Sequence, residues 1–116
     1  MNIFNMSKYH RMCYQTTTYL MLNGFLRLDY LTDVGPRIAR LFLGKSDSNL
    51  LADLPGAEVD SAYGKFQFMG GHRLWHSPEG MPRSYVPDQA VTIETLPDGI
   101  RMRAATEPHT GIAKSI

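Results

Sequence analysis

Apolar and polar side chains alternate along much of the chain, and this two-residue period is typical of strands with one buried face. The alternation is clearest over residues 25–31, 90–96 and 100–105. Residues 15–22 and 37–43 are also rich in β-branched, aromatic or aliphatic side chains, which favour strands. We find no apolar spacing typical of a helix of ten or more residues. The pattern therefore predicts an all-β protein.

Turn signals separate the predicted strands. Asn23-Gly24 lies between the first two strands and favours a tight hairpin, because both residues tolerate a positive φ. The Pro-Asp-Gly sequence at 97–99 predicts a second hairpin near the C-terminus. We also expect a turn at 32–36, a short strand at 49–54 and a loop at 55–64. Short strands joined by such turns predict an antiparallel β-sandwich.

The two ends of the chain differ from its middle. Residues 1–13 are rich in Met and Asn and have no clear period, so we expect an N-terminal tail, either loose or with a short helix. The β domain is then expected over 14–116. Residues 112–116 begin a further alternating run in which the sequence stops. This ending predicts a partial sandwich with an open sheet edge.

Composition narrows the class of protein. The 116 residues are enough for one domain, and 43% hydrophobic with 20% charged residues is typical of a globular chain. The net charge of +1, without a basic run, argues against a nucleic-acid partner. The lone Cys13 excludes an internal disulfide and is compatible with a reducing compartment. We find neither a signal peptide nor an apolar run of the roughly 20 residues that span a membrane, so we expect a cytoplasmic protein without a membrane partner.

The ten residues from Gly70 to Glu79 hold the only Trp and two of the four His. Gly-Gly opens this segment and Ser-Pro follows the second His, which argues against a helix. If the segment is a strand, Arg73 and Trp75 share one face. The other face then carries His72, Leu74 and His76.

Arg73 and Trp75 together suit a polar ligand such as a sugar. A guanidinium provides forked donors for oxygen atoms, and an indole provides an apolar platform. The alternative is that Trp75 belongs to the core and Arg73 stacks on it as a cation–π pair. Three Pro residues between 78 and 87 predict an extended, non-helical segment, in which Arg83 and Tyr85 either extend the polar site or form a surface brace.

His72 and His76 titrate near neutral pH and are therefore candidate general acids. Glu79 is the carboxylate nearest to them in the sequence, although it is more simply interpreted as a solvated loop residue. Asp88, Glu94 and Glu107 are also available, and no spacing selects one of them. A metal site at the two His is disfavoured, because residues four apart on a strand are roughly 13 Å apart.

Several of these motifs resemble the galactose mutarotase-like (aldose 1-epimerase-like) superfamily, and most closely its poorly characterised bacterial members. The resemblance covers about residues 19–116. It rests on the Gly-Gly-His-Arg-Leu-Trp core and on four further segments, which are 33–38, 49–51, 82–88 and 110–114.

The resemblance implies a large antiparallel β-sandwich that binds sugars in a groove. Family enzymes interconvert α and β anomers with a His acid and a Glu base, and they require no cofactor. It also implies that Arg73 binds the sugar and that His72 or His76 lies in the groove. The family's base Glu comes from a later part of the fold, so the chain resembles an N-terminal half that is inactive by itself.

The sequence thus predicts a carbohydrate-binding protein whose partner is a small sugar. The catalytic candidates are His72 and His76, and the substrate-binding candidates are Arg73, Trp75, Glu79 and Arg83; no metal is expected. One alternative is a non-catalytic β module that self-associates through its open sheet edge. Another is a small metal-dependent β-barrel enzyme that uses His72, His76 and Glu79.

Overall fold

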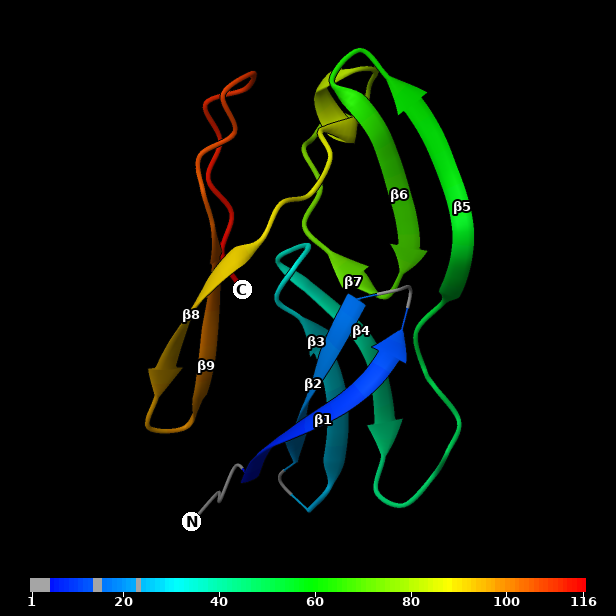
Figure 1. Cartoon of the computed structure of the whole chain (residues 1–116), viewed down its shortest axis with the longest axis vertical. Coiled ribbons are helices and arrows are strands. Elements are labelled where there is room, and N and C mark those ends of the chain that lie inside the picture. Colours follow the sequence, from blue (N-terminus) through cyan, green and yellow to red (C-terminus); the bar gives the residue numbers. More distant parts are fainter. Residues whose placement is uncertain (1–4, 14–15, 23) are drawn as a thin grey trace.

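The computed structural model describes the backbone of residues 5–13, 16–22 and 24–116, and the side chains from Gly24 onward. Its largest sheet is antiparallel and five-stranded, in the order β1-β2-β3-β4-β7 (Figure 1). These strands are β1 (Asn5–Cys13), β2 (Thr16–Leu22), β3 (Leu26–Leu31), β4 (Arg37–Leu43) and β7 (His72–Arg73).

The predicted hairpin of β2 and β3 is confirmed, with Leu22 opposite Arg27 across the turn. Gly24 has a φ of 86°, as a tight turn requires, whereas Gln15 and Asn23 of the prediction lie outside the described residues. The strand at 37–43 and the turn before it are confirmed as well. The all-β, antiparallel class is thus confirmed, and the sandwich arrangement stays a prediction.

A small cluster of buried apolar side chains lies where β3 and β4 meet Met69 of the hairpin that follows them in the chain. Leu31, Ala39 and Met69 pack together there, with Val34 against them. Removal of these side chains from water stabilises the contact of this sheet with the hairpin that contains Met69.

Residues 53–70 form a second antiparallel pair, β5 (Asp53–Ser61) and β6 (Gly64–Gly70). The prediction of a strand at 49–54 and a loop at 55–64 is therefore wrong. The register of β5 shifts between Leu54 and Glu58, around a Gly56 with a φ of 77°. Such an irregularity accommodates Pro55 and interrupts the alternation that would identify a strand from the sequence.

The loose tail or short helix predicted for residues 1–13 is wrong for Asn5–Cys13, which form β1 and pair with β2, whereas residues 1–4 of that prediction lie outside the described residues. The pairing is irregular between Ser7 and Arg11. This bulge explains why the sequence of β1 has no period of two.

The predicted C-terminal hairpin is confirmed as β8 (Val91–Leu96) and β9 (Gly99–Ala104). The last residues run beside β9 (Figure 1), where Ala104 N donates to the Lys114 carbonyl. Two backbone hydrogen bonds link this hairpin to the first sheet, from Gly35 N to Gln89 O and from Val91 N to Thr32 O. Together these contacts bring the C-terminal segment next to residues 86–89.

Helical structure is limited in the described ranges to one 3-10 turn, Arg83–Tyr85. The expectation of a wholly extended 80–88 segment is wrong at this turn, which two backbone hydrogen bonds close, from Ser84 N to Gly80 O and from Tyr85 N to Pro82 O. Over the same described ranges, no helix has the length and apolar character needed to cross a membrane.

Candidate functional site

Asp88 lies at the centre of a buried ion-pair network. Its carboxylate accepts hydrogen bonds from Arg73 Nε and Nη2 and from Arg37 Nη2, at 2.9–3.1 Å. All three side chains are at most 8% exposed. Arg37 Nη1 also donates to the carbonyls of Phe68 and Gly70. Burial lowers the pKa of Arg37, and the Asp88 carboxylate opposes this shift.

Strand pairing places the two arginines side by side, because Arg37 of β4 is directly opposite Arg73 of β7. The close approach of these strands depends on Gly71, whose φ is 71°. A Cβ atom at Gly71 would lie 2.2 Å from the carbonyl oxygen of Ile38. Only glycine fits there, so Gly71 allows the close pairing of β7 with β4 that sets Arg73 beside Arg37.

Glu107 is a second buried carboxylate, and it is linked to the Asp88 network through Lys114. Its carboxylate accepts a hydrogen bond from Thr110 Oγ1 at 2.6 Å, and Lys114 Nζ lies 3.1 Å away. Burial raises the pKa of Glu107, but the hydrogen bond from Thr110 and the charges of Lys114 and His76 outweigh it, so the pKa lies below its ordinary value. Lys114 Nζ is also 3.8 Å from Asp88 Oδ1 and thus links Glu107 to the ion pairs of Asp88.

His76 contributes a buried imidazole to this network. Its side chain is 6% exposed, and its Nε2 lies 3.3 Å from Glu107 Oε2. The distance suits an ion pair with a protonated ring, but the geometry is not that of a hydrogen bond. Among the described residues, both ring nitrogens of His76 and the Nε of Arg37 lack a hydrogen-bond partner. The network therefore contains buried N–H groups that have no acceptor among the described residues.

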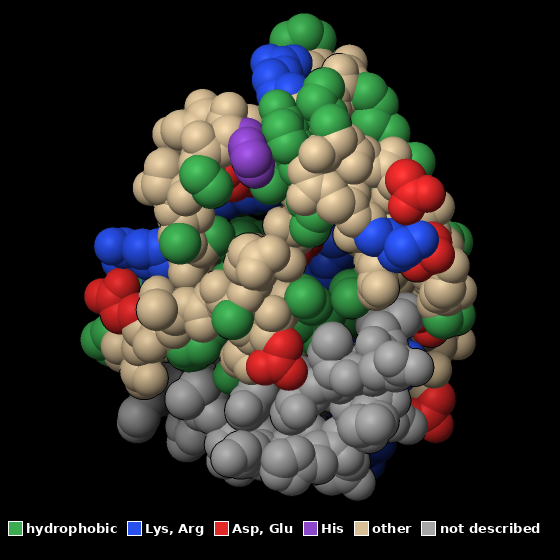
Figure 2. All heavy atoms as spheres, turned by 45° about the horizontal axis from the view of Figure 1, so that its top comes forward, with side chains coloured by type: hydrophobic (Ala, Val, Ile, Leu, Met, Phe, Trp, Pro, Cys, Tyr) green, Lys and Arg blue, Asp and Glu red, His purple; other side chains and the backbone are tan. Residues whose placement is uncertain are grey.

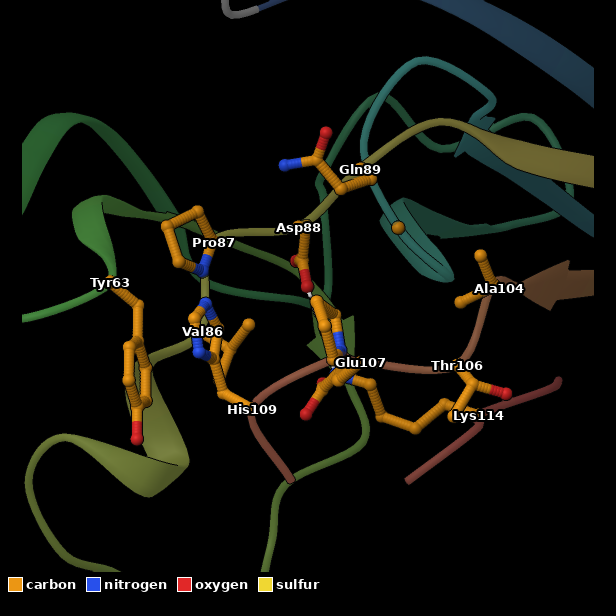
Figure 3. A pocket seen from close by; sticks show the side chains of 13 residues that line it. Tyr63, Val86, Pro87, Asp88, Gln89, Ala104, Thr106, Glu107, His109 and Lys114 are labelled. Carbon is orange, nitrogen blue, oxygen red and sulfur yellow. Dashed lines mark ion pairs between the residues drawn. The ribbon is translucent and has the colours of Figure 1, made fainter. Parts of the chain in front are cut away.

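A cavity of about 370 Å³ opens against this network (Figure 3). Figure 2 shows acidic and basic side chains deep in a hollow of the molecular surface, beside a His side chain. At one side of the cavity the rings of Tyr63 and His109 stack, with centroids 4.0 Å apart and an interplanar angle of 10°. The other lining residues are Gly35, Val86, Pro87, Asp88, Gln89, Ala104, Ala105, Thr106, Glu107, Pro108 and Lys114.

Gly70 is the last residue of β6, and beyond it the segment to Glu79 forms a strand only at His72–Arg73, so the interpretation of Gly70–Glu79 as one continuous strand is wrong. Gly70 and Gly71 both have positive φ at its start, and the segment continues irregularly toward Pro78. Alternation consequently fails as a guide to its faces. His72 is exposed, whereas the side chain of His76 is buried against Glu107.

Arg73 and Trp75 do lie together, as the sequence suggested. The guanidinium carbon of Arg73 is 4.6 Å from the Trp75 ring centroid and 4.8 Å from that of Phe66. With its side chain 3% exposed and paired with Asp88, Arg73 supports the network from behind the cavity. Trp75 is 44% exposed and packs against Phe66 and Tyr85 outside the cavity lining.

Glu79 and Arg83 lie in the turn beyond Trp75 and do not line the cavity. Glu79 accepts a hydrogen bond from the Tyr85 hydroxyl, and Arg83 donates to the Pro78 carbonyl. The hydrogen bond with Glu79 raises the pKa of Tyr85. Within residues 24–116, no three His, Cys, Asp or Glu side chains are grouped so as to hold a metal ion. The trio of His72, His76 and Glu79 is accordingly not brought together.

In the sequence, Asp88 and Glu107 are two of several candidate carboxylates for the site. No pattern in the sequence marks Tyr63, His109 or Lys114 as site residues. Lys114 carries one weak signal, as a lone charge in an otherwise small and apolar run. No known protein family, curated protein or solved structure matches this chain. The cavity and its network are therefore the features that indicate a function.

Proposed function

We propose that this chain binds a small carbohydrate in the cavity beside Glu107 and Lys114. The observation that carries the proposal is the combination of polar and aromatic groups in the lining of one cavity. Lys114 and Glu107 are fixed at the wall with side chains 7% and 10% exposed, and the stacked rings of Tyr63 and His109 lie nearby. Sugars present hydroxyl groups and apolar C–H faces, which need these two kinds of partner.

The size of the cavity supports a ligand of one sugar ring. Ligand sites commonly have volumes of about 300–1,000 Å³, and the cavity volume of about 370 Å³ is at the small end of that range. The resemblance of the sequence to mutarotase-like proteins supports the same class of ligand. A cytoplasmic location, expected from the sequence, is part of the proposal.

We propose binding rather than catalysis. Aldose epimerisation needs a base that removes a proton from the anomeric hydroxyl and an acid that protonates the ring oxygen. Glu107 is a weak base because its pKa is lowered, and His76 lies behind Glu107 rather than at the cavity wall. These features favour a ligand held in place over one that exchanges protons with the protein.

Calorimetric titration of the full chain with D-glucose and D-galactose tests the proposal. We expect millimolar or tighter binding of at least one sugar, and a loss of about tenfold or more in affinity in Glu107→Gln, because a charged hydrogen-bond partner is removed. Glu94→Gln is the matched control, since Glu94 is an exposed residue of β8 paired with Arg101. Equal affinity in wild type and Glu107→Gln would remove this cavity as the sugar site.

A second candidate function is a non-catalytic interaction module. It is supported by β1, a nine-residue strand at one end of the sheet order, and by exposed apolar side chains at Phe25, Leu43 and Leu50. Light scattering over a hundredfold range of protein concentration tests it. A mass that stays at one chain throughout would argue against pairing between copies.

A further inference from the structure

We propose that the ligand of the cavity is anionic, and that a carboxylate or phosphate group on it binds at Lys114. The inference rests on the proposed sugar site and specifies the class of sugar. A sugar acid or a sugar phosphate would place its charged group at Lys114 and its ring near Tyr63 and His109.

The first argument is the balance of charge in the buried network. Ion pairs connect three cations, Arg37, Arg73 and Lys114, with the two carboxylates of Asp88 and Glu107. The network consequently holds one surplus positive charge, and protonation of His76 would add another. A buried charge without a counterion is costly, and an anion in the adjoining cavity would offset that cost.

The second argument is that the carboxylates are already occupied by protein donors. Asp88 accepts hydrogen bonds from Arg37 and Arg73, and Glu107 accepts from Thr110 while it pairs with Lys114. Asp88 therefore has little acceptor capacity left, and Glu107 keeps only the lone pairs that Thr110 and Lys114 do not use. Unused donors of the network include Arg37 Nε and a ring N–H of His76, which have no hydrogen-bond partner among the described residues. Neither residue lines the cavity, so the cationic donors within reach of a ligand are those of Lys114.

The third argument is position. Among the three cations of the network, Lys114 is the one that lines the cavity, and Figure 3 shows its side chain extending toward Glu107. An ammonium group has three donors, and its contacts with Glu107 and Asp88 are 3.1 and 3.8 Å. The longer contact is too long for a hydrogen bond, so a ligand oxygen can accept from that donor.

Calorimetry with matched ligands tests the inference on the unmodified chain. D-glucuronate and D-glucose 6-phosphate are compared with D-glucose, and sodium acetate and inorganic phosphate serve as probes of the charged group alone. We expect at least one acidic sugar to bind about tenfold or more tightly than D-glucose, because hydrogen bonds to charged groups are the stronger ones. The preference of the site between glucuronate and the phosphate ester identifies which charged group it takes.

The outcomes separate this inference from the proposed function. Equal affinity for D-glucose and both acidic sugars would overturn the anionic ligand and leave carbohydrate binding intact. Acetate or phosphate binding as tightly as the matching acidic sugar would support an anion site and overturn sugar recognition. Absence of binding by every ligand would overturn both.

A pair of variants locates the charged group. Lys114→Met should abolish the preference for the acidic sugar over D-glucose, whereas Lys45→Met, an exposed lysine in the turn after β4, should preserve it. An unchanged preference in folded Lys114→Met, checked by circular dichroism, would overturn the assignment to Lys114. The comparison of ligands on the wild-type chain decides the inference if this variant does not fold.

Discussion

Arg73 holds Asp88 through a forked pair of hydrogen bonds, from Nε at 3.0 Å and from Nη2 at 2.9 Å. The same guanidinium stacks on Trp75 and Phe66. Asp88 lines the cavity, whereas Arg73 lies behind it. Arg73, which the sequence predicts to bind the ligand, therefore instead fixes Asp88, which lines the cavity.

Asp88→Asn should strongly destabilise the fold. The substitution keeps the shape of the side chain but removes the charge that Arg37 and Arg73 share, and it leaves two buried guanidinium groups uncompensated. Loss of one partner of a buried ion pair typically costs about 3–5 kcal/mol. Urea unfolding measures the change, and Asp98→Asn in the exposed β8–β9 turn is the control. A midpoint equal to that of the control would contradict the structural role of the network.

Gly71→Ala should destabilise the chain by more than about 1 kcal/mol. Gly71 has a φ of 71°, and an added Cβ would lie 2.2 Å from the Ile38 carbonyl oxygen. Because β4 and β7 would have to separate, Arg73 would be displaced as well. Gly80→Ala is the matched control, since an added Cβ there meets no atom within 4 Å. Equal thermal midpoints for the two variants would show that the close approach at Gly71 is not required.

How far the sequence predicts the fold depends on how local its signals are. The hairpins around Gly24 and Gly99 follow from alternation and turn residues within a few positions of each other, and both are present. The strand β5 could not be predicted in the same way, because a register shift near Gly56 interrupts its pattern. The strand β1 was missed for a similar reason.

The site is less predictable because its residues come from distant parts of the chain. Asp88, Glu107 and Lys114 are separated by 7 to 26 positions and meet because the C-terminal segment runs back along β9. No motif spacing encodes such a meeting. The segment around Arg73 was conspicuous for its composition, and its role in supporting the cavity emerges only from the pairing of β4 and β7.

The stability of the chain should fall more steeply with acid in wild type than in Glu107→Gln. The pKa of Glu107 is below its ordinary value of 4.5 in the folded state, because Thr110 and Lys114 outweigh the effect of burial. The resulting stabilisation is complete above that ordinary value and is lost as the pH falls through the lower folded pKa. Urea midpoints between pH 6 and pH 3 should therefore converge for the two proteins as the pH falls. Glu94→Gln should follow the wild-type slope, and parallel curves for wild type and Glu107→Gln would contradict the lowered pKa.

Arg73→Lys should separate the charge of this side chain from its shape. A lysine keeps the positive charge near Asp88 but cannot make the forked pair of hydrogen bonds or stack as a plane on Trp75 and Phe66. We expect a loss of about 1–3 kcal/mol in urea unfolding. The only Trp then provides an independent readout, because removal of the planar group should make Trp75 more accessible to acrylamide quenching. Arg101→Lys, in the exposed pair with Glu94, should change neither quantity. If Arg73→Lys behaves like that control, charge alone holds Asp88 in place and the stacked geometry contributes little.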